Sequence, residues 1–444
     1  MVRVGSFLAQ KIKRILLSTG FIVVVAFAVR MAYCWYILGI REIAVPDKHP
    51  YGAETGAIAS AIASGHGFSS PVLGLASGPT AWLAPIYPYL LAAIFKLFGI
   101  FTFKSSVIIR SLDIAFSAFV CWPLYAIGKK VFGTNVGAAS TWLWALLPAG
   151  VYYSVIWVWD TALAALCMTL LFAATLHLRG RSKLSWWLGY GALWGFSAMV
   201  NPSVLSLLPF FAIWALRPLR NEWLRAAKLA SAAAVVFLAA ITPWTVRNYL
   251  VFHKFIPLRS NFGLELWLGN SPEVPDTWAG FLHPTNDRAE AAKYLRMTEI
   301  PYMEEKQSEA FAFMRSHPVD TSRFFFRRFE DNWIGSWDAP ADEWRFLHLA
   351  DKLALFWNCL FSLLALAGTL LVNRTKNEAA FPLTATLLVF PLLFYATHTD
   401  ERYRNPIDPI MCLLAGYALG YFLSSLAKRA SSLHRAAQSA PDLG

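Results

Sequence analysis

The stretch Thr161–Val200 reads TALAALCMTLLFAATLHL, then RGRSK, then LSWWLGYGALWGFSAMV, and it decides the fold class. Both apolar runs are free of Asp, Glu, Lys and Arg. A run of roughly 17–25 apolar residues can cross the hydrocarbon core of a bilayer as a helix. The short turn between them is rich in Lys and Arg, which are typical of the cytoplasmic side. The stretch therefore predicts two transmembrane helices joined by a cytoplasmic turn.

The composition extends this reading to the whole chain. Its 444 residues are 57% hydrophobic and only 15% charged, whereas soluble proteins carry about a quarter of charged residues. The net charge of +12 lies in short clusters between apolar runs and not in a basic stripe with stacking aromatics, so nucleic acid is not a predicted partner. The cysteines have no metal-ligand or disulfide spacing and are predicted to pack in apolar runs: Cys34, Cys121, Cys167, Cys359 and Cys412.

Apolar runs predict about ten spanning helices. They are Ile15–Leu38, Ser106–Ile127, Val136–Ile156, Thr161–Leu178, Leu184–Val200, Val204–Leu216, Leu229–Thr245, Leu353–Val372, Ala379–Thr397 and Ile407–Ala427. The first run continues to about Ile40 without a small-residue cleavage site, so we expect a retained anchor helix. The segment Ala84–Gly99 is short and contains two prolines. We place it along the outer surface, because a crossing there would turn every later basic cluster outward.

This topology predicts an all-α, polytopic membrane protein with both termini in the cytoplasm. Residues 1–247 form a membrane core with a first outer loop at 41–105, and 248–352 form an extracytoplasmic loop domain. Residues 353–427 supply the last helices, and 428–444 a cytoplasmic tail. The loop domain is too long and too rich in aromatic and charged residues for a plain linker, so we expect a small, partly helical cap.

Two acidic candidates lie in outer loops. Glu54 begins a helical pattern with Ile58 and Ile62, where a carboxylate either stabilises a helix start or acts as a general base. Asp47, seven residues upstream, is its rival or helper. Asp160 follows Trp159 at the second outer turn and is either a helix-start residue or a second carboxylate of an outer site.

Two further charges lie within predicted spans. Arg30 and Asp113 each lie about 10–12 Å below the outer interface at about 1.5 Å per residue. Buried charges in a membrane are costly and usually paired, so we expect a structural Arg30–Asp113 pair, with Arg110 as a competing partner of Asp113.

Basic residues also gather on the predicted outer face, against the usual charge distribution. They are Arg247, Lys254 and Arg259 in Thr242–Asn270, and Arg402 and Arg404 in Thr397–Pro409. A single arginine there could reach up to lipid headgroups, but two clusters on one face predict a bound anion, for which the planar guanidinium is well suited.

The order of these features resembles the GT-C membrane glycosyltransferases. The resemblance is carried by the acid in the first outer loop, by GPTAWLAPIYPYLLAAIFKLFG at Gly78–Gly99, by the acidic second loop and by RYRNPIDP at Arg402–Pro409. The nearest branch is the family-39-like bacterial group related to protein mannosyltransferases and aminoarabinose transferases. The resemblance implies a polyprenyl-phosphate sugar donor, a catalytic carboxylate in the first loop and basic residues that hold the lipid phosphate. Many relatives carry an Asp-Glu pair where this chain has Tyr51-Gly-Ala-Glu54, so the base is Glu54 or Asp47, and we favour Glu54.

The resulting hypothesis is an inverting glycosyltransferase of the plasma (inner) membrane with its site on the extracytoplasmic face. A carboxylate would deprotonate an acceptor hydroxyl of a lipid, glycan or protein while arginines stabilise the departing phosphate. No nucleotide-binding motif is present, no cofactor is certain, and a divalent cation shared by Asp160 is one option. The alternatives are a secondary transporter or lipid flippase and a lipid-binding scaffold. Transporters favour ionisable groups at the midplane and matching halves, which this chain lacks.

Overall fold

The fold is known from a computed structural model, which describes residues 14–44, 51–275, 277–335 and 349–438. Within these ranges the chain is helical, with no strand, as predicted for an all-α protein. The α-helices are α2 (Thr19–Ala44), α3 (Ala53–Ala63), α4 (Ile86–Phe98), α5 (Phe103–Phe119), α6 (Cys121–Phe132), α7 (Thr134–Leu146), α8 (Pro148–Val155), α9 (Thr161–Leu178), α10 (Leu184–Val200), α11 (Leu208–Leu216), α12 (Trp223–Phe252), α13 (Phe262–Gly269), α14 (Arg288–Met297), α15 (Glu299–Ser316), α16 (Pro318–Ile334), α17 (Leu349–Arg374), α18 (Ala380–Val389), α19 (Leu392–Ala396) and α20 (Asp408–Gln438). The short 3-10 helices are η1 (Pro202–Leu207), η2 (Arg217–Glu222), η3 (Gly280–Leu282) and η5 (Glu401–Arg404).

Six stretches of the described chain are long and apolar enough to cross a membrane. They are Thr19–Gly39, Phe103–Phe132, Thr161–Leu178, Pro202–Phe252, Lys352–Arg374 and Asp408–Ser432. The remaining predicted spans coincide with shorter helices, namely α7 with α8, α10, and α18 with α19. Helix α4 has 13 residues and, at about 1.5 Å per residue, is only about 20 Å long, which is less than a bilayer core of about 30 Å. The protein is therefore a multi-pass membrane protein, and ten crossings remain a prediction.

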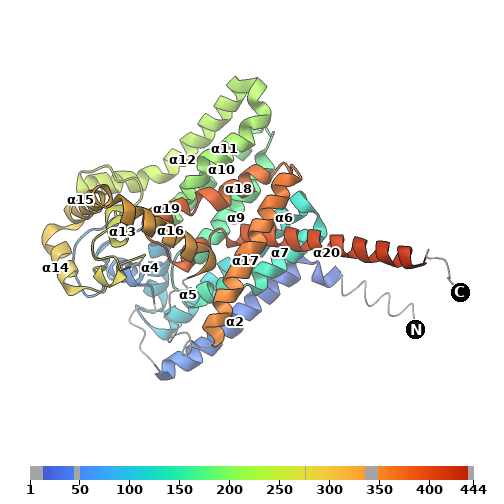
Figure 1. The fold of residues 1–444 in the computed structure, drawn as a ribbon. Coiled ribbons are helices and arrows are strands. Elements are labelled where there is room, and N and C mark those ends of the chain that lie inside the picture. The colour runs from blue at the N-terminus through green and yellow to red at the C-terminus, as the bar shows by residue number, and fades with distance from the viewer. Residues whose placement is uncertain (1–13, 45–50, 276, 336–348, 439–444) are drawn as a thin grey trace.

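The helices form a bundle with a cap at one end (Figure 1). Helices α13–α16 gather there, and α4 lies beside them, whereas α2 begins and α20 ends at the opposite end of the bundle (Figure 1). The cap has its own apolar core, which includes Trp82 of the first loop together with Trp267 and Tyr302. The first outer loop and the 248–352 segment, separate in sequence, thus share one end of the molecule.

A buried carboxylate joins the first loop to the cap. Glu299, at the start of α15, accepts hydrogen bonds from the Ala81 amide (2.7 Å) and the Ser260 hydroxyl (2.6 Å). Thr80 Oγ1 also donates to it, and Arg247 Nη1 donates to the Thr80 carbonyl oxygen at 2.6 Å. Tyr294 Oη of α14 donates to it as well, at 3.1 Å. Because one carboxylate accepts hydrogen bonds from three segments, it fixes the loop against the cap.

The predicted Arg30–Asp113 ion pair is not formed, and this corrects the sequence analysis. Arg30 is fully buried and donates to Ser117 Oγ (2.9 Å) and to the carbonyl oxygens of Trp144 (3.0 Å) and Ala145 (2.8 Å). Pro148 explains these partners, because it has no N–H and ends α7, which leaves carbonyls of the last turn without their helical donors. Asp113 instead accepts a hydrogen bond from Tyr87 Oη at 2.7 Å.

Candidate active site

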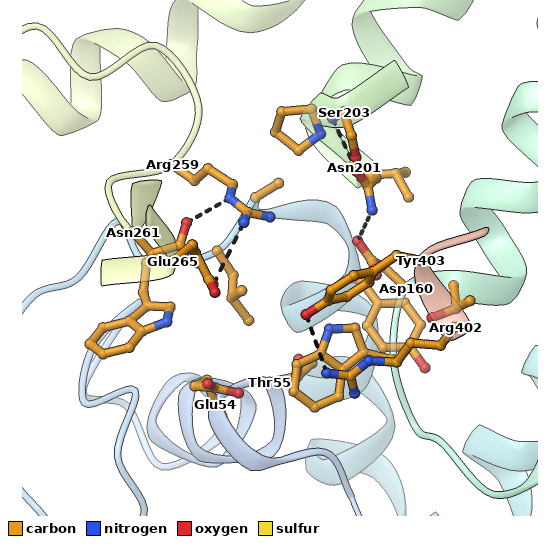
Figure 2. Close-up of a pocket in the computed structure, with 18 of the residues that line it drawn as sticks. Glu54, Thr55, Asp160, Asn201, Ser203, Arg259, Asn261, Glu265, Arg402 and Tyr403 are labelled. Atoms are coloured by element: carbon orange, nitrogen blue, oxygen red, sulfur yellow. Dashed lines mark hydrogen bonds and ion pairs between the residues drawn. The ribbon is translucent and has the colours of Figure 1, made fainter. Parts of the chain in front are cut away.

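A cavity of about 260 Å³ lies where the first outer loop, the second outer turn, the cap and the segment before α20 meet. Glu54 and Asp160 both line it, together with Arg259, Glu265 and Arg402 (Figure 2). These side chains come from α3, the turn before α9, the start of the cap, α13 and η5. Segments far apart in sequence therefore place acids and bases around one space.

A glycine allows the two acidic loops to approach. Gly52 precedes α3 and has a φ of 74°, in the left-handed region that favours glycine. A Cβ atom at this position would lie 2.3 Å from the Val158 carbonyl oxygen, so only glycine fits. This contact brings the first turn of α3, with Glu54, next to the turn that carries Asp160.

Glu54 is buried, and the two oxygens of its carboxylate differ. Oε1 lies 3.1 Å from His283 Nε2 of the cap, whereas Oε2 has no hydrogen-bond partner among the described residues. Burial alone would raise the pKa of Glu54, but the hydrogen bond from His283 and the charge of Arg402 outweigh it and hold this pKa below its ordinary value. An ionised carboxylate with one unused oxygen beside a cavity is suited to accept a proton.

Asp160 sits one residue before α9 and does not cap it with its side chain. Its Oδ2 accepts a hydrogen bond from Asn201 Nδ2 at 3.1 Å, across the cavity wall (Figure 2). Burial raises the pKa of Asp160 to about 6, against the opposing effects of Arg259, Asn201 and Arg402. Asp160 is therefore a weaker acid than Glu54 in the same cavity.

Among the predicted cations, Arg402 has the surroundings that most resemble a preformed anion-binding site. Its guanidinium carbon lies 4.7 Å from the ring centres of both Trp157 and Trp159, so both indoles make cation–π contacts with it. Nη2 donates to Tyr403 Oη at 3.5 Å and Nε lies 3.6 Å from Asp400 Oδ2, while Nη1 is buried and makes no hydrogen bond with described residues. Burial would lower the pKa of Arg402, but Tyr403, Asp400 and Glu54 raise it above its ordinary value, so the group stays charged.

Arg259 is a second cation in the cavity. Its Nε donates to Asn261 Oδ1 at 2.6 Å, and its Nη2 lies 3.9 Å from Glu265 Oε1. Burial raises the pKa of Glu265, and the charge of Arg259 only partly offsets this. Arg259 lies across the cavity from Arg402 (Figure 2), so the two guanidinium groups approach the space from opposite sides.

The other predicted cations do not line this cavity. Arg404 donates to Asp408 Oδ1 (2.9 Å) and to the Asn332 carbonyl oxygen (2.9 Å). Arg247 holds the first loop, as described above, and Lys254 pairs with Glu304 on the exposed surface of the cap. Arg402 and Arg404 diverge because they belong to the same 3-10 helix, in which residues two apart point in different directions.

Several residues that line the cavity or contact its acidic side chains carry no signal in the sequence. His283 follows η3 in the cap, and His398 and Tyr403 precede α20, where His398 Nε2 lies 2.9 Å from Tyr403 Oη. Burial, reinforced by the charges of Arg328 and Arg402, lowers the pKa of His398 to about 3, so its contact with Glu265 at 3.4 Å involves a neutral ring. The contacts of these histidines with acidic side chains depend on packing between distant segments, which the spacing of residues along the sequence does not reveal.

A divalent cation finds no ready site among the described residues, where no three His, Cys, Asp or Glu side chains are grouped to hold a metal ion. Asp47, the third acidic candidate, lies outside the described residues.

Comparison with known proteins supports the family resemblance. Residues 82–246 match the family model described as dolichyl-phosphate-mannose-protein mannosyltransferase. A comparison with curated proteins finds no match. The match covers the second half of the first loop, α4 to α11 and most of α12, and it includes Asp160 but not Glu54.

Solved structures of an archaeal oligosaccharyltransferase have the same fold. The oligosaccharyltransferase of Archaeoglobus fulgidus in complex with zinc and sulfate has a TM-score of 0.54 at 11% identity, covering 96% of this chain and 51% of that chain. Its apo form has a TM-score of 0.54 at 12% identity, covering 96% and 52%. The apo ArnT of Cupriavidus metallidurans has a TM-score of 0.38 at 15% identity, covering 90% and 78%. This chain spans about half the length of the archaeal protein, and the predicted resemblance to GT-C membrane glycosyltransferases is confirmed.

Proposed function

We propose that this chain is an inverting membrane glycosyltransferase that moves a sugar from a polyprenyl-phosphate donor to an acceptor hydroxyl. One observation carries the proposal: one cavity is lined by a carboxylate with an unused oxygen, Glu54 Oε2, and by a buried cation, Arg402, whose Nη1 has no hydrogen-bond partner among the described residues. A base for the nucleophile and a cation for the leaving group are what displacement at a glycosyl phosphate requires. The match of residues 82–246 to a dolichyl-phosphate-mannose family model supports this donor class.

In the proposed reaction, the acceptor oxygen attacks the anomeric carbon while the bond from that carbon to the phosphate oxygen breaks. Glu54 Oε2 takes the hydroxyl proton, and the electron pair of the broken bond stays on the lipid phosphate. Arg402 stabilises the growing negative charge, because a guanidinium can donate two N–H groups to phosphate oxygens. Attack from the side opposite the phosphate inverts the anomeric centre.

The remaining polar residues of the cavity are assigned to positioning. Arg259 approaches from the opposite side and would bind sugar hydroxyls or share the phosphate with Arg402. Asp160, held by Asn201, would accept a hydrogen bond from the acceptor. Neither group is assigned a proton transfer.

We further propose that the cavity faces the extracytoplasmic side of the plasma (inner) membrane. The cap, which contributes Arg259 and Glu265 to the lining of the cavity, is at the end of the bundle opposite the start of α2 and the end of α20 (Figure 1). The basic cluster at 179–183 lies between α9 and α10, and Lys428 and Arg429 lie in the C-terminal half of α20, whereas the N-terminal ends of α9 and α20 are next to the cavity. Such clusters favour the cytoplasm.

The test is transfer by the purified protein from a panel of labelled polyprenyl-phosphate sugars to membrane extracts. Glu54→Gln should reduce the transfer rate by about 100-fold or more, because general base catalysis contributes roughly 10²–10⁴-fold. Glu304→Gln, which changes an exposed carboxylate of the cap, is the matched control and should be unaffected. Near-normal transfer by Glu54→Gln would overturn the assignment of the base. Movement of the intact donor lipid across the membrane without cleavage would instead identify a flippase.

A further inference from the structure

The cap supplies the direct partner of the candidate base. His283 is 7% exposed, and its Nε2 lies 3.1 Å from Glu54 Oε1, although the two residues belong to separate outer segments. The His283 ring also packs edge-on against Trp82, with ring centres 5.7 Å apart. The contact is therefore dry, and a hydrogen bond in such surroundings is stronger than one in water.

The hydrogen bonds of His283 assign its tautomer. The backbone N–H of Thr285 points at His283 Nδ1 at 3.2 Å, and Thr285 Oγ1 lies 2.6 Å from the same atom. A backbone N–H can only donate, so Nδ1 is an acceptor and carries no proton. The remaining ring proton is then on Nε2, where it points at Glu54.

The backbone around His283 is fixed by a tight turn. Its carbonyl oxygen accepts hydrogen bonds from the amides of Asn286 (2.7 Å) and Asp287 (2.9 Å). Asn286 Nδ2 donates to the Gly280 carbonyl oxygen at 2.9 Å, and Asp287 caps α14 by accepting from the Glu290 amide at 2.7 Å. These bonds fix the backbone from which the imidazole projects.

We propose that His283 is the positioning residue of the base: its Nε2–H holds Glu54 Oε1 and keeps the carboxylate ionised, which leaves Oε2 to take the proton of the acceptor. The proposal rests on the proposed function. It makes the loop domain part of the active site, because without the Gly280–Asp287 turn the carboxylate would lose its hydrogen-bond donor. His283 itself touches no reacting atom.

The electrostatic surroundings agree with this role. Three groups act on Glu54 or respond to it: His283 from the cap turn, Arg402 from η5 and Glu265 from α13. Arg402 favours the ionised form of Glu54 and Glu265 opposes it, so the hydrogen bond from His283 adds to the effect of Arg402. Loss of the hydrogen bond therefore leaves burial, which favours the protonated acid, less well opposed.

The experiment measures the protonation of Glu54 directly. Infrared pH titrations of the full-length protein in nanodiscs, from which the spectrum of Glu54→Gln is subtracted, isolate the carboxylic acid C=O band of Glu54. His283→Leu removes the donor and should raise the midpoint of this band by about one to two pH units, the effect of one hydrogen bond to a charged group. His283→Gln, whose amide can still donate, should keep the wild-type midpoint. His317→Leu, on an exposed histidine of the cap, is the control.

Activity gives the second readout. At pH 5.5, His283→Leu should reduce kcat by up to about 10-fold while the KM for the donor changes little, and His283→Gln should restore most of kcat. If His283→Leu fails to insert, His283→Asn takes its place, because its amide is too short to reach Oε1. An unshifted band with normal kcat in the variant lacking a donor would overturn the proposal. If Glu54→Gln abolishes transfer in that case, only the role of His283 fails, whereas an active Glu54→Gln removes the proposed base itself.

Discussion

Replacement of Arg402 tests the phosphate site most directly. Arg402→Ala removes a charged group whose guanidinium carbon lies 4.7 Å from each of two indole rings and whose Nη1 has no hydrogen-bond partner among the described residues. Arg402→Lys keeps the charge but loses the planar fork and much of the stacking. The two variants therefore separate the contribution of charge from that of geometry.

The expected loss of kcat/KM in Arg402→Ala follows from the hydrogen bonds that the guanidinium can donate to phosphate. Each hydrogen bond from a charged group contributes about 1.5–3 kcal/mol, so two bonds to phosphate contribute about 3–6 kcal/mol. At about 1.36 kcal/mol per tenfold change, Arg402→Ala should lower kcat/KM for the donor by roughly 10²–10⁴-fold. Arg402→Lys, which can replace one of the two bonds, should lose about 10–100-fold.

The assay measures initial rates over a series of donor concentrations, with the polyprenyl-phosphate sugar that supports transfer in the panel. Arg315→Ala, in which an exposed arginine of the cap is removed, is the matched control and should behave as the wild type. Thermal unfolding checks each variant, since the lost cation–π contacts contribute about 0.5–2 kcal/mol each to stability. A folded Arg402→Ala protein with an unchanged kcat/KM for the donor would refute the reasoning, and the phosphate would then have to bind elsewhere.

Two further predictions concern pH and topology. The pKa of Asp160 rises from 3.8 to about 6 on burial, so the folded state favours the protonated form and loses this stabilisation as pH rises from about 4 to about 6. Asp160→Asn should therefore increase the free energy of unfolding at pH 8, by at most about 3 kcal/mol, with a difference below about 1 kcal/mol at pH 4, and thermal unfolding at both values checks this. An equal effect at both pH values would contradict the burial argument. Single cysteines at Thr134 and Glu273, in a chain with Cys359 replaced by serine, should react with an impermeant maleimide from the cytoplasmic and the outer side, respectively. Labelling of both from one side would end the predicted topology.

The sequence by itself determined the class of protein and the positions of its helices. The predicted segments Thr161–Leu178 and Leu184–Val200 coincide with α9 and α10 residue for residue. The prediction of these helices succeeds because a membrane-spanning segment must form its backbone hydrogen bonds within itself. The hydropathy of the segment therefore decides its secondary structure. Hydropathy also indicated Glu54 and Asp160 as candidate site residues, because both lie at the starts of predicted helices. The structure places both at one cavity.

Tertiary structure decided which charges act together. Of the five outer cations, Arg402 and Arg259 line the cavity, whereas Arg404 donates hydrogen bonds to Asp408 and to a backbone carbonyl of α16. Arg30 bonds to carbonyls that Pro148 leaves free and not to Asp113, and Glu54 pairs with His283 of the cap. Each of these partners depends on the direction of a side chain and on contacts between segments distant along the chain. Hydropathy and charge order along a sequence do not contain such directions, because they arise only when the helices pack.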